Sequence, residues 1–320
     1  MTATRRVRIA RKTVEAQDIC SFELVAPEGG ALPRFAAGAH IDVHLGGGLV
    51  RQYSLCNDPR ETQRYQIAVL REPASRGGSI AMHALQPGHA LEISAPRNHF
   101  AQAHDASHHL LLAGGIGITP ILCMAEQLAA EGASFALHYC TRSAERTAFA
   151  QRLRSAPFAS QVQLHHDDGA AAQKLDLAAL LASPRPGTHL YVCGPSGFME
   201  AVLSAARAAG WPEARLHREY FAAAAPKGNG HDGAFEVQVA SSGAVIRVAP
   251  DQAVVAALAA AGIEVPVSCE QGVCGTCLTR VLDGVPDHRD LFLSDEERAR
   301  GDQFTPCCSR AKSHRLVLDL

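Results

Sequence analysis

The stretch Ser268-Cys-Glu-Gln-Gly-Val-Cys-Gly-Thr-Cys277 places three cysteines close together, and a fourth, Cys307, follows thirty positions later. This pattern, C-x4-C-x2-C with a distant cysteine, is a spacing by which proteins hold a [2Fe–2S] cluster. Gly272 and Gly275 separate the cysteines and allow the backbone to approach the sulfur atoms, so that amides can hydrogen-bond them. The pattern therefore predicts four cluster ligands, Cys269, Cys274, Cys277 and Cys307.

Other interpretations of these cysteines are open. Four-cysteine zinc sites usually pair one C-x2-C with another, and the second pair is absent from this sequence. Buried free thiols are a further alternative. Cys308 directly follows Cys307, so it is an alternative fourth ligand. The remaining cysteines are scattered singly, unlike the disulfide framework of a small secreted domain, which favours a cytoplasmic location.

Length and charge limit the remaining interpretations. A chain of 320 residues has room for two or three domains. Its 30 basic and 32 acidic residues argue against a nucleic-acid partner, which requires a basic face. No apolar run is long enough to span a membrane, so no membrane partner is expected. The sixteen histidines show no metal-pair spacing, and we expect them at surface or strand positions.

Hydrophobic periodicity divides the chain into three modules. Short apolar runs separated by Gly and Pro clusters fill residues 1–104 and predict an antiparallel barrel or sandwich, with one helix after Gly78 capped by Ser79. Strands alternate with helices over residues 105–226, which predicts a doubly wound α/β domain. Residues 227–233 are small and turn-rich, as in a linker. Residues 234–320 then predict a small α+β domain around the cysteine loop.

The segment Arg51-Gln-Tyr-Ser-Leu-Cys-Asn57 closes a predicted strand and suits a flavin. Arg51 can pair with a phosphate, Tyr53 can stack or hydrogen-bond at the ring system, and backbone groups of Leu55 and Cys56 can face the ring edge. Downstream, Arg76-Gly-Gly-Ser79 offers free amides and a hydroxyl to a phosphate. Each segment alone is also typical of an ordinary strand or turn.

Two further motifs suit a nucleotide. Gly114-Gly-Ile-Gly-Ile-Thr-Pro120 is a turn between a strand and a helix, where a pyrophosphate can approach backbone amides. It lacks the G-x-G-x-x-G pattern, and a tight turn without a ligand is the alternative. Cys193-Gly-Pro195 ends another strand at the carboxyl edge of the sheet, where its thiol can line a nicotinamide pocket or belong to the core.

The order of these motifs resembles the phthalate dioxygenase reductase family of ferredoxin-reductase-type flavoproteins. Members of this family join a flavin-binding β-barrel, a nucleotide-binding α/β domain and a plant-type [2Fe–2S] ferredoxin domain of the β-grasp type. The resemblance covers essentially the whole chain. The segment His217-Arg-Glu-Tyr-Phe221 resembles the end of the family's nucleotide domain, where a glutamate and an aromatic residue lie near the flavin. Phe221 as a core residue is the alternative.

The resemblance and the motifs together assign roles to residues at matching positions. The expected catalytic residues are Cys193 and Glu219. The expected flavin contacts are Arg51, Tyr53, Ser54, Leu55, Cys56, Gly77, Gly78, Ser79 and Phe221. The expected dinucleotide contacts are Gly115, Gly117, Thr119, Pro120, Gly194 and Pro195.

The resemblance implies electron transfer from NADH to FMN, then to the cluster and finally to a Rieske-type oxygenase acting on an aromatic acid. Within the family, the motifs are most similar to reductases of vanillate O-demethylase systems, and a monomer is implied. FAD in place of FMN stays open, as does NADPH, because Asp167 and Asp168 favour NADH whereas Arg142 and Arg146 suit a 2′-phosphate.

Three other functions are alternatives. The first is a reductase for another acceptor, namely a carnitine-type oxygenase, a phthalate-type dioxygenase or a haem monooxygenase. The second is a redox sensor without a dedicated oxygenase partner. The third is a zinc-stabilised binding module, which an iron-free, colourless protein would indicate.

Overall fold

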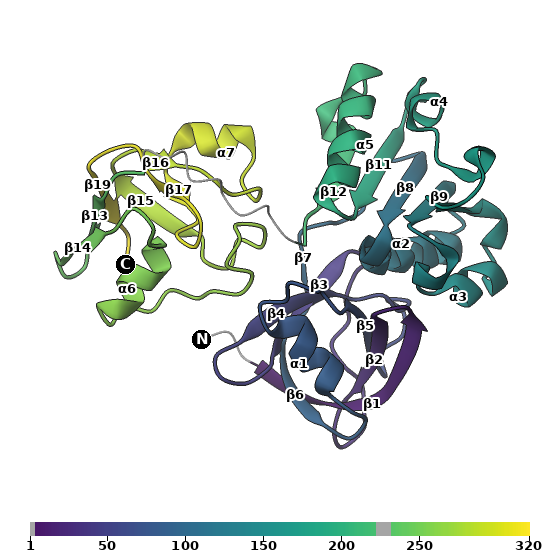
Figure 1. The fold of residues 1–320 in the computed structure, drawn as a ribbon, viewed down its shortest axis with the longest axis horizontal. Helices are drawn as coiled ribbons and strands as arrows, with labels where there is room; N and C mark the ends of the chain where they lie inside the picture. The colour runs from purple at the N-terminus through teal and green to yellow at the C-terminus, as the bar shows by residue number, and fades with distance from the viewer. Residues whose placement is uncertain (1–3, 222–231) are drawn as a thin grey trace. The chain divides into compact units, whose positions relative to one another are not determined.

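A computed structural model describes residues 4–221 and 232–320 (Figure 1). The chain divides into two compact units, Met1–Glu219 and Tyr220–Leu320. The first unit contains both the barrel and the parallel sheet, so the boundary expected at residue 104 stays a prediction. The expected linker, residues 227–233, lies outside the described residues except for Asp232 and Gly233.

The first half of the first unit is an antiparallel barrel. Its elements are β1 (Thr4–Ala16), β2 (Ile19–Val25), β3 (Ala39–His44), β4 (Val50–Ser54), β5 (Tyr65–Leu70), α1 (Gly78–Ala84), β6 (Ala90–Ser94) and β7 (Arg97–Asn98). The strands follow the order β4-β3-β6-β1-β2-β5, and a bridge between Leu55 and Ile67 joins the two end strands. Alternate residues such as Phe22 and Leu24 are fully buried, because a pleated strand directs every second side chain inward.

The start of α1 corrects one expectation. Gly77 is the capping residue, with a φ of 90°, and no side chain caps the helix. Ser79 lies inside the helix instead, where its Oγ accepts a hydrogen bond from the amide of Glu72 at 3.1 Å. A positive φ at Gly77 turns the chain directly into the helix, which begins one residue before Ser79.

A parallel sheet flanked by helices completes the first unit. Its strands are β8 (His108–Gly114), β9 (Phe135–Thr141), β10 (Val162–His166), β11 (Thr188–Cys193) and β12 (Leu216–Glu219). Its helices are α2 (Ile118–Glu131), α3 (Ala150–Ser155), α4 (Leu177–Leu181) and α5 (Ser196–Ala208). Short 3₁₀ helices are η1 (Gly115–Gly117), η2 (Ala144–Arg146), η3 (Ala159–Gln161), η4 (Ala171–Gln173) and η5 (Glu213–Arg215).

The strand order β10-β9-β8-β11-β12 places a topological switch between β8 and β11. The chain proceeds outward from β8 in one direction and from β11 in the other, so right-handed crossovers put α2 and α5 on opposite faces. This is the predicted doubly wound class. Ligands of such sheets bind beyond the carboxyl ends of the strands at the switch.

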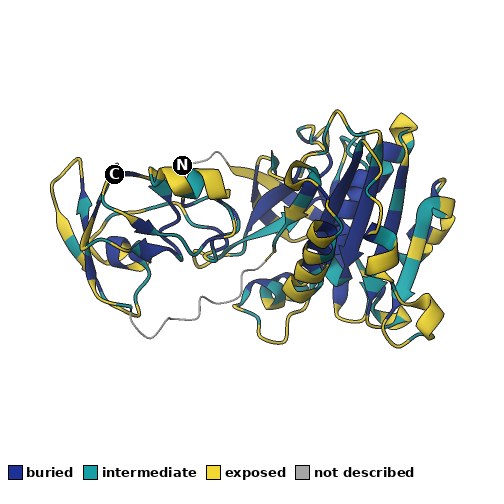
Figure 2. Cartoon of the chain, turned by 90° about the horizontal axis from the view of Figure 1, so that it is seen from above, coloured by how far each residue is buried: buried dark blue, intermediate teal, exposed yellow. Residues whose placement is uncertain are grey.

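One hydrophobic core joins the barrel to the sheet. It contains Ile19 and Ala68 of the barrel together with Ile121 and Tyr139 of the α/β part. Figure 2 shows a block of buried strands in the first unit, and β8 and β11 are buried along almost their whole length, whereas the outer strands β10 and β12 are only partly buried. Because the two parts share a core, side chains at their junction are held in fixed positions.

The second unit is a mixed sheet with two helices. Its elements are β13 (Phe235–Val239), β14 (Val245–Val248), α6 (Val254–Ala260), β15 (Thr279–Asp283), β16 (Pro286–Asp287), α7 (Asp295–Arg300), β17 (Gln303–Phe304), β18 (Arg310–Ala311) and β19 (Arg315–Leu318). The main sheet has the order β14-β13-β19-β15-β17. Val254 and Leu258 of α6 pack on Val237 and Leu316 of the sheet. The predicted α+β class is confirmed. Among all described helices, none has the length and apolarity needed to span a membrane.

Candidate functional site

Three side chains from distant parts of the sequence meet where the barrel contacts the parallel sheet. Ser54 ends β4, Cys193 ends β11 and Glu219 ends β12. The Oγ of Ser54 donates a hydrogen bond to Oε2 of Glu219 at 3.1 Å, and Cys193 is the in-register partner of Glu219. Ser54 and Cys193 are buried, and Glu219 is partly buried. The structure therefore brings together both residues expected to be catalytic and one expected flavin contact.

Burial sets the charge of this group of side chains. Desolvation raises the pKa of Glu219 to about 8, although the hydrogen bond from Ser54 acts in the opposite direction. Desolvation also raises the pKa of the Cys193 thiol, and the neighbouring Glu219 adds to this effect. Both groups are therefore uncharged at neutral pH. Such a site can hold a proton on the carboxyl group without carrying a net charge.

The glycine turn lies at the switch point between β8 and β11. A Cβ atom on Gly117 would lie 2.2 Å from the carbonyl oxygen of Cys193, and one on Gly194 would lie 2.9 Å from Cα of Gly114. The two backbones are therefore in direct contact, which only glycine permits. Gly115 has a φ of 52° and open space around its Cα, so its backbone is accessible to a ligand.

The remaining expected dinucleotide contacts are parts of helix starts. Thr119 and Pro120 lie in the first turn of α2 and are buried. The hydroxyl of Thr119 donates to the carbonyl of Ile116 at 3.1 Å. Pro195 directly precedes α5. These residues shape the turn, and their contact with a nucleotide stays a prediction.

Arg51 and the segment Gly77–Ser79 lie together on the barrel. A Cβ atom on Gly78 would lie 2.5 Å from Cγ of Arg51, so the arginine side chain crosses the glycine directly. Its guanidinium donates to the carbonyls of Val50 at 2.7 Å and Arg76 at 3.0 Å. Arginine has five N–H donors, so further donors are left for an anion at this place.

Leu55 and Cys56 offer fewer backbone groups to a flavin than the sequence predicted. Both are fully buried. Their amides donate within the barrel, that of Leu55 to Ala39 and that of Cys56 to Gln66, each at 2.9 Å. Only their carbonyl oxygens are left for a flavin.

The barrel wall beside Ser54 contains buried polar atoms suited to a ligand. His40 is the cross-strand partner of Ser54. Within the described part of the chain, Nε2 of His40 and Nε2 of Gln52 are buried without a hydrogen-bond partner. Buried polar atoms are normally satisfied, so these two fit a polar ring system bound against β4. Tyr53 lies between Gln52 and Ser54, and desolvation raises its pKa, which keeps its hydroxyl protonated. Phe221 belongs to the second unit and is 40% exposed, so its place at a flavin stays a prediction.

The expected cluster ligands are all buried in the second unit, at 3–8% exposure. Hydrogen bonding from Cys274 and Cys307 lowers the pKa of Cys269, and hydrogen bonding from Cys307 lowers that of Cys277. The four sulfurs are thus within reach of one another. In the described ranges, no three His, Cys, Asp or Glu side chains are placed around a single metal ion. A [2Fe–2S] cluster divides its ligands between two irons, so it requires a wider arrangement.

The loop backbone also fits a cluster. The amides of Gln271 and Thr276 donate to the sulfurs of Cys269 and Cys274, each at 3.4 Å. Gly275 has a φ of 68°, and a Cβ atom there would lie 2.3 Å from the ring of Phe292. A side chain at this position would displace the loop that carries the thiols.

The nucleotide-specificity candidates lie side by side. The amide of Asp168 donates to the carbonyl of Arg142 at 3.2 Å, where β9 and β10 end. Both an acidic and a basic residue are therefore at the edge where a ribose is expected, and the choice of nucleotide stays a prediction.

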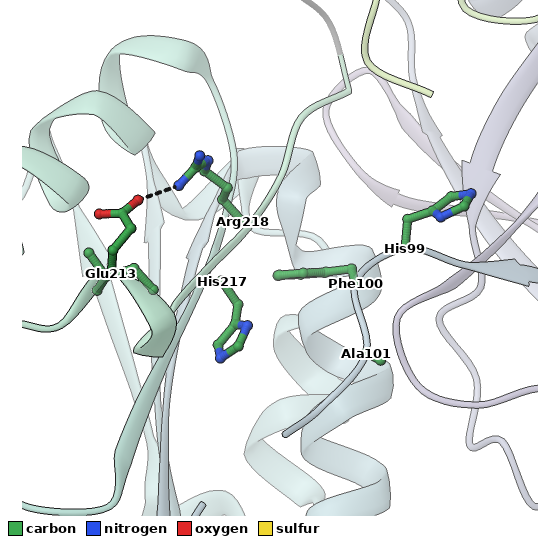
Figure 3. A pocket seen from close by; sticks show the side chains of 7 residues that line it. His99, Phe100, Ala101, Glu213, His217 and Arg218 are labelled. Atoms are coloured by element: carbon green, nitrogen blue, oxygen red, sulfur yellow. Dashed lines mark hydrogen bonds and ion pairs between the residues drawn. The ribbon is translucent and has the colours of Figure 1, made fainter. Parts of the chain in front are cut away.

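Sequence reasoning missed a row of histidines that begins on β12, two residues before Glu219. His217 and His189 are in contact on β12 and β11, with Nε2 of His217 2.9 Å from Nδ1 of His189. Figure 3 shows His217 at the wall of a pocket of about 320 Å³ together with His99 and Phe100. The sequence does show a histidine near the start of each of these two predicted strands. Whether the two rings meet depends on the register of the strands, which the sequence does not give.

Comparisons with known proteins agree with this geometry. Residues 237–312 match the family model "2Fe-2S iron-sulfur cluster binding domain", and residues 94–216 match "Dimethylamine monooxygenase subunit DmmA-like, N-terminal domain". Vanillate O-demethylase oxidoreductase of Pseudomonas sp. (strain HR199 / DSM 7063) is 58% identical over 98% of this chain and 99% of its own length.

Two solved structures are also similar. One is phthalate dioxygenase reductase, described as a modular structure for electron transfer from pyridine nucleotides to [2Fe-2S]. It is 42% identical with a TM-score of 0.77, covering 99% of this chain and 98% of its own. The other is an intact type IV self-sufficient cytochrome P450 monooxygenase, 40% identical with a TM-score of 0.87, covering 99% of this chain and 41% of its own longer chain.

Proposed function

The chain belongs to the phthalate dioxygenase reductase family, and on this premise we propose that it passes electrons from NADH through FMN and its own [2Fe–2S] cluster to a Rieske-type oxygenase. One observation carries the proposal. A single chain combines a site built for a two-electron donor, at Ser54, Cys193 and Glu219, with a four-cysteine loop built for a one-electron carrier.

A bound flavin supplies the conversion, because it accepts a hydride and releases electrons singly. Arg51 and the amides of Gly77–Ser79 would hold the flavin phosphate. His40 and Gln52 offer their unpartnered nitrogens to the ring. Ser54 and Glu219 would hold a proton beside the flavin, and Cys193 would present an uncharged thiol to the nicotinamide.

FMN is favoured over FAD, because the phosphate segment has no aromatic shelf for an adenine in the sequence around Gly77. NADH is favoured over NADPH. We test both assignments together, by extracting and identifying the flavin and by comparing turnover with the two nucleotides. Release of FAD or a preference for NADPH contradicts the respective choice. We propose a monomer, which sedimentation analysis tests.

The relatives support a choice of oxygenase partner. The 58% identity to a vanillate O-demethylase oxidoreductase favours an oxygenase that removes a methyl group from an aromatic acid. The likeness to part of the chain of a self-sufficient cytochrome P450 monooxygenase favours a haem monooxygenase as the second candidate. Reconstitution with each oxygenase type distinguishes them: NADH-driven demethylation of vanillate supports the first, and electron delivery only to a haem partner supports the second.

An anaerobic absorbance titration with NADH tests the electron route itself. We expect flavin bands to bleach and [2Fe–2S] bands then to fade, with an electron uptake equal to the capacity of both centres. A protein that shows neither set of bands after reconstitution contradicts the proposed function.

A further inference from the structure

A row of side chains continues from the Ser54–Glu219 hydrogen bond along one face of the parallel sheet. His217 precedes Glu219 by two residues on β12, and residues two apart in a strand point to the same face. Their Cα atoms are about 7 Å apart, a gap that one water can bridge between the side chains. The ring of His217 stacks on Tyr191 of β11, with centroids 4.5 Å apart and planes inclined by 12°.

The row ends at solvent. Nε2 of His217 lies 2.9 Å from Nδ1 of His189, so one ring donates a hydrogen bond and the other accepts it. Nε2 of His189 lies 3.6 Å from a carboxylate oxygen of Asp105, whose side chain is 85% exposed. Nδ1 of His217 takes no part in the contact with His189. A neutral imidazole has one donor and one acceptor nitrogen, so it can accept a proton on one side while releasing one on the other.

His217 also borders the pocket shown in Figure 3. With a volume of about 320 Å³, the pocket has room for several waters, each of which occupies about 30 Å³. Glu213 and Arg218 form an ion pair at 2.9 Å on its wall, and Glu213 also pairs with Arg207. The hydrogen bond from Arg207 lowers the pKa of Glu213 to about 2, so a carboxylate faces the pocket at neutral pH.

The proposed function leaves one proton behind in each cycle. NADH gives a hydride, which amounts to one proton and two electrons, and one-electron acceptors remove only the electrons. The balance is NADH + 2 A(oxidised) → NAD⁺ + H⁺ + 2 A(reduced). A proton must therefore leave the neighbourhood of Ser54 and Glu219 once per NADH, and the core shared by barrel and sheet limits the ways out.

We propose that His217 is the exit for this proton, which passes from Glu219 through His217 to the water of the pocket and to His189 and Asp105. The inference rests on the proposed function. The titratable groups that act on His217 from the sheet side are His189, His109, Asp105 and Tyr191. His99, Glu213 and Arg218 line the same pocket. Burial lowers the pKa of His217 to about 4, with His189 adding to the effect. His217 is therefore neutral at rest and passes the proton on without storing it.

The sheet contains a matched control. His138 and His165 on β9 and β10 form a second histidine pair, with ring centroids 5.3 Å apart against 5.2 Å for His189 and His217. Nδ1 of His165 is held by the carbonyl of Gln173 at 2.9 Å, and His165 does not border the pocket. His165→Ala thus removes an equivalent ring outside the proposed path.

Stopped-flow measurement on the holoenzyme tests the path. In His217→Ala we expect NADH to bleach the flavin at the wild-type rate, whereas electron release to the cluster and the appearance of the proton in a weakly buffered indicator both slow about a hundredfold. Imidazole added to the buffer enters the space left by the ring and restores both. His165→Ala shows neither the loss nor the rescue. Equal behaviour of the two variants, or slowing without rescue by imidazole, overturns the proposal.

A second readout needs no turnover. Histidine ¹⁵N NMR of the full-length protein, with and without flavin, follows the titration of His217. In the wild type we expect the ¹⁵N shifts of His217 to change as Glu219 ionises around pH 8. We expect Glu219→Gln to remove this change and to leave the shifts of His165 unaltered. If the ¹⁵N shifts of His217 depend on pH in the same way in the wild type and in Glu219→Gln, the proposed path is overturned. If wild-type protein fails to oxidise NADH at all, the proposed function has failed, and this titration still decides whether His217 and Glu219 share protons.

Discussion

Replacing Glu219 by Gln should make the first unit more stable at alkaline pH. Burial raises the pKa of Glu219 from an ordinary 4.5 to about 8. Between these values the folded protein binds a proton that the unfolded chain does not, so the free energy of unfolding falls as pH rises. The contribution of the protonated carboxyl is complete below pH 4.5, is lost progressively up to pH 8 and is absent above it. Gln stays neutral throughout and escapes this loss.

The full pKa change corresponds to at most about 5 kcal/mol. Glu219 is only partly buried, so water screens the ionised form, and we expect about 2 kcal/mol. The stability of Glu219→Gln relative to wild type should therefore rise by about 2 kcal/mol between pH 5 and pH 9. Taking the difference between the two proteins cancels every other group that titrates in this range.

Trp211 allows the unfolding of the first unit to be measured by itself. It is the sole tryptophan of the chain, is 6% exposed, and donates from Nε1 to the carbonyl of Leu181 at 3.0 Å. Its fluorescence in urea reports the unfolding of the first unit. Glu213→Gln is the control, because the pKa of Glu213 is lowered and its contribution is lost only in acid. A flat or falling difference for Glu219→Gln from pH 5 to pH 9 would refute the buried, protonated carboxyl.

Four further predictions concern the two redox sites. Cys274→Ser should abolish cluster reduction and spare NADH-dependent bleaching of the flavin; loss of both would contradict separate sites. Cys307→Ser should remove the [2Fe–2S] absorption and Cys308→Ser should keep it, because Cys308 is less buried and its thiol contacts Thr305 at 3.3 Å; the reverse result would exchange the two assignments. Cys193→Ala should slow hydride transfer measured by stopped flow at unchanged flavin content, and wild-type kinetics would make Cys193 a structural residue. Gly117→Ala should destabilise the first unit by about 3 kcal/mol, because its Cβ would meet the Cys193 carbonyl. Gly115→Ala has open space around its Cβ and should cost about 1 kcal/mol for its positive φ. Equal costs of the two substitutions in urea unfolding, followed by Trp211 fluorescence, would count against the close backbone contact.

Features encoded by local sequence were predictable. The cysteine spacing around Gly272 and Gly275 indicates the cluster loop, because the ligands of one loop must be near each other whatever the rest of the fold does. Alternation of strands and helices likewise predicts the parallel sheet, since right-handed crossovers leave few other arrangements. The cap of α1 was placed two residues late, at Ser79 instead of Gly77, because a glycine with positive φ can precede a helix without a capping side chain.

Features that depend on closure of the barrel were harder to predict from the sequence. Leu55 and Cys56 belong to the segment that suits a flavin, and the sequence predicted that their backbone groups face the ring edge. In the structure both amides complete the barrel, where the chain after β4 meets β3 and β5. A strand's hydrogen bonds depend on which neighbours it acquires, and no local pattern in the segment Arg51–Asn57 specifies them.

The protonation of Glu219 and the row formed by His217 and His189 depend on strand register, which no local sequence pattern specifies. Ser54 and Glu219 are 165 positions apart, so their hydrogen bond exists only after the barrel docks on the sheet. Tyr191 and His217 are paired in register, and a shift of β12 by one residue would turn His217 away from Tyr191 and Glu219 away from Ser54 together. The register of the edge strand β12 therefore determines the positions of both Glu219 and His217. A variant that slips this strand should lose both contacts at once, whereas His217→Ala removes only one.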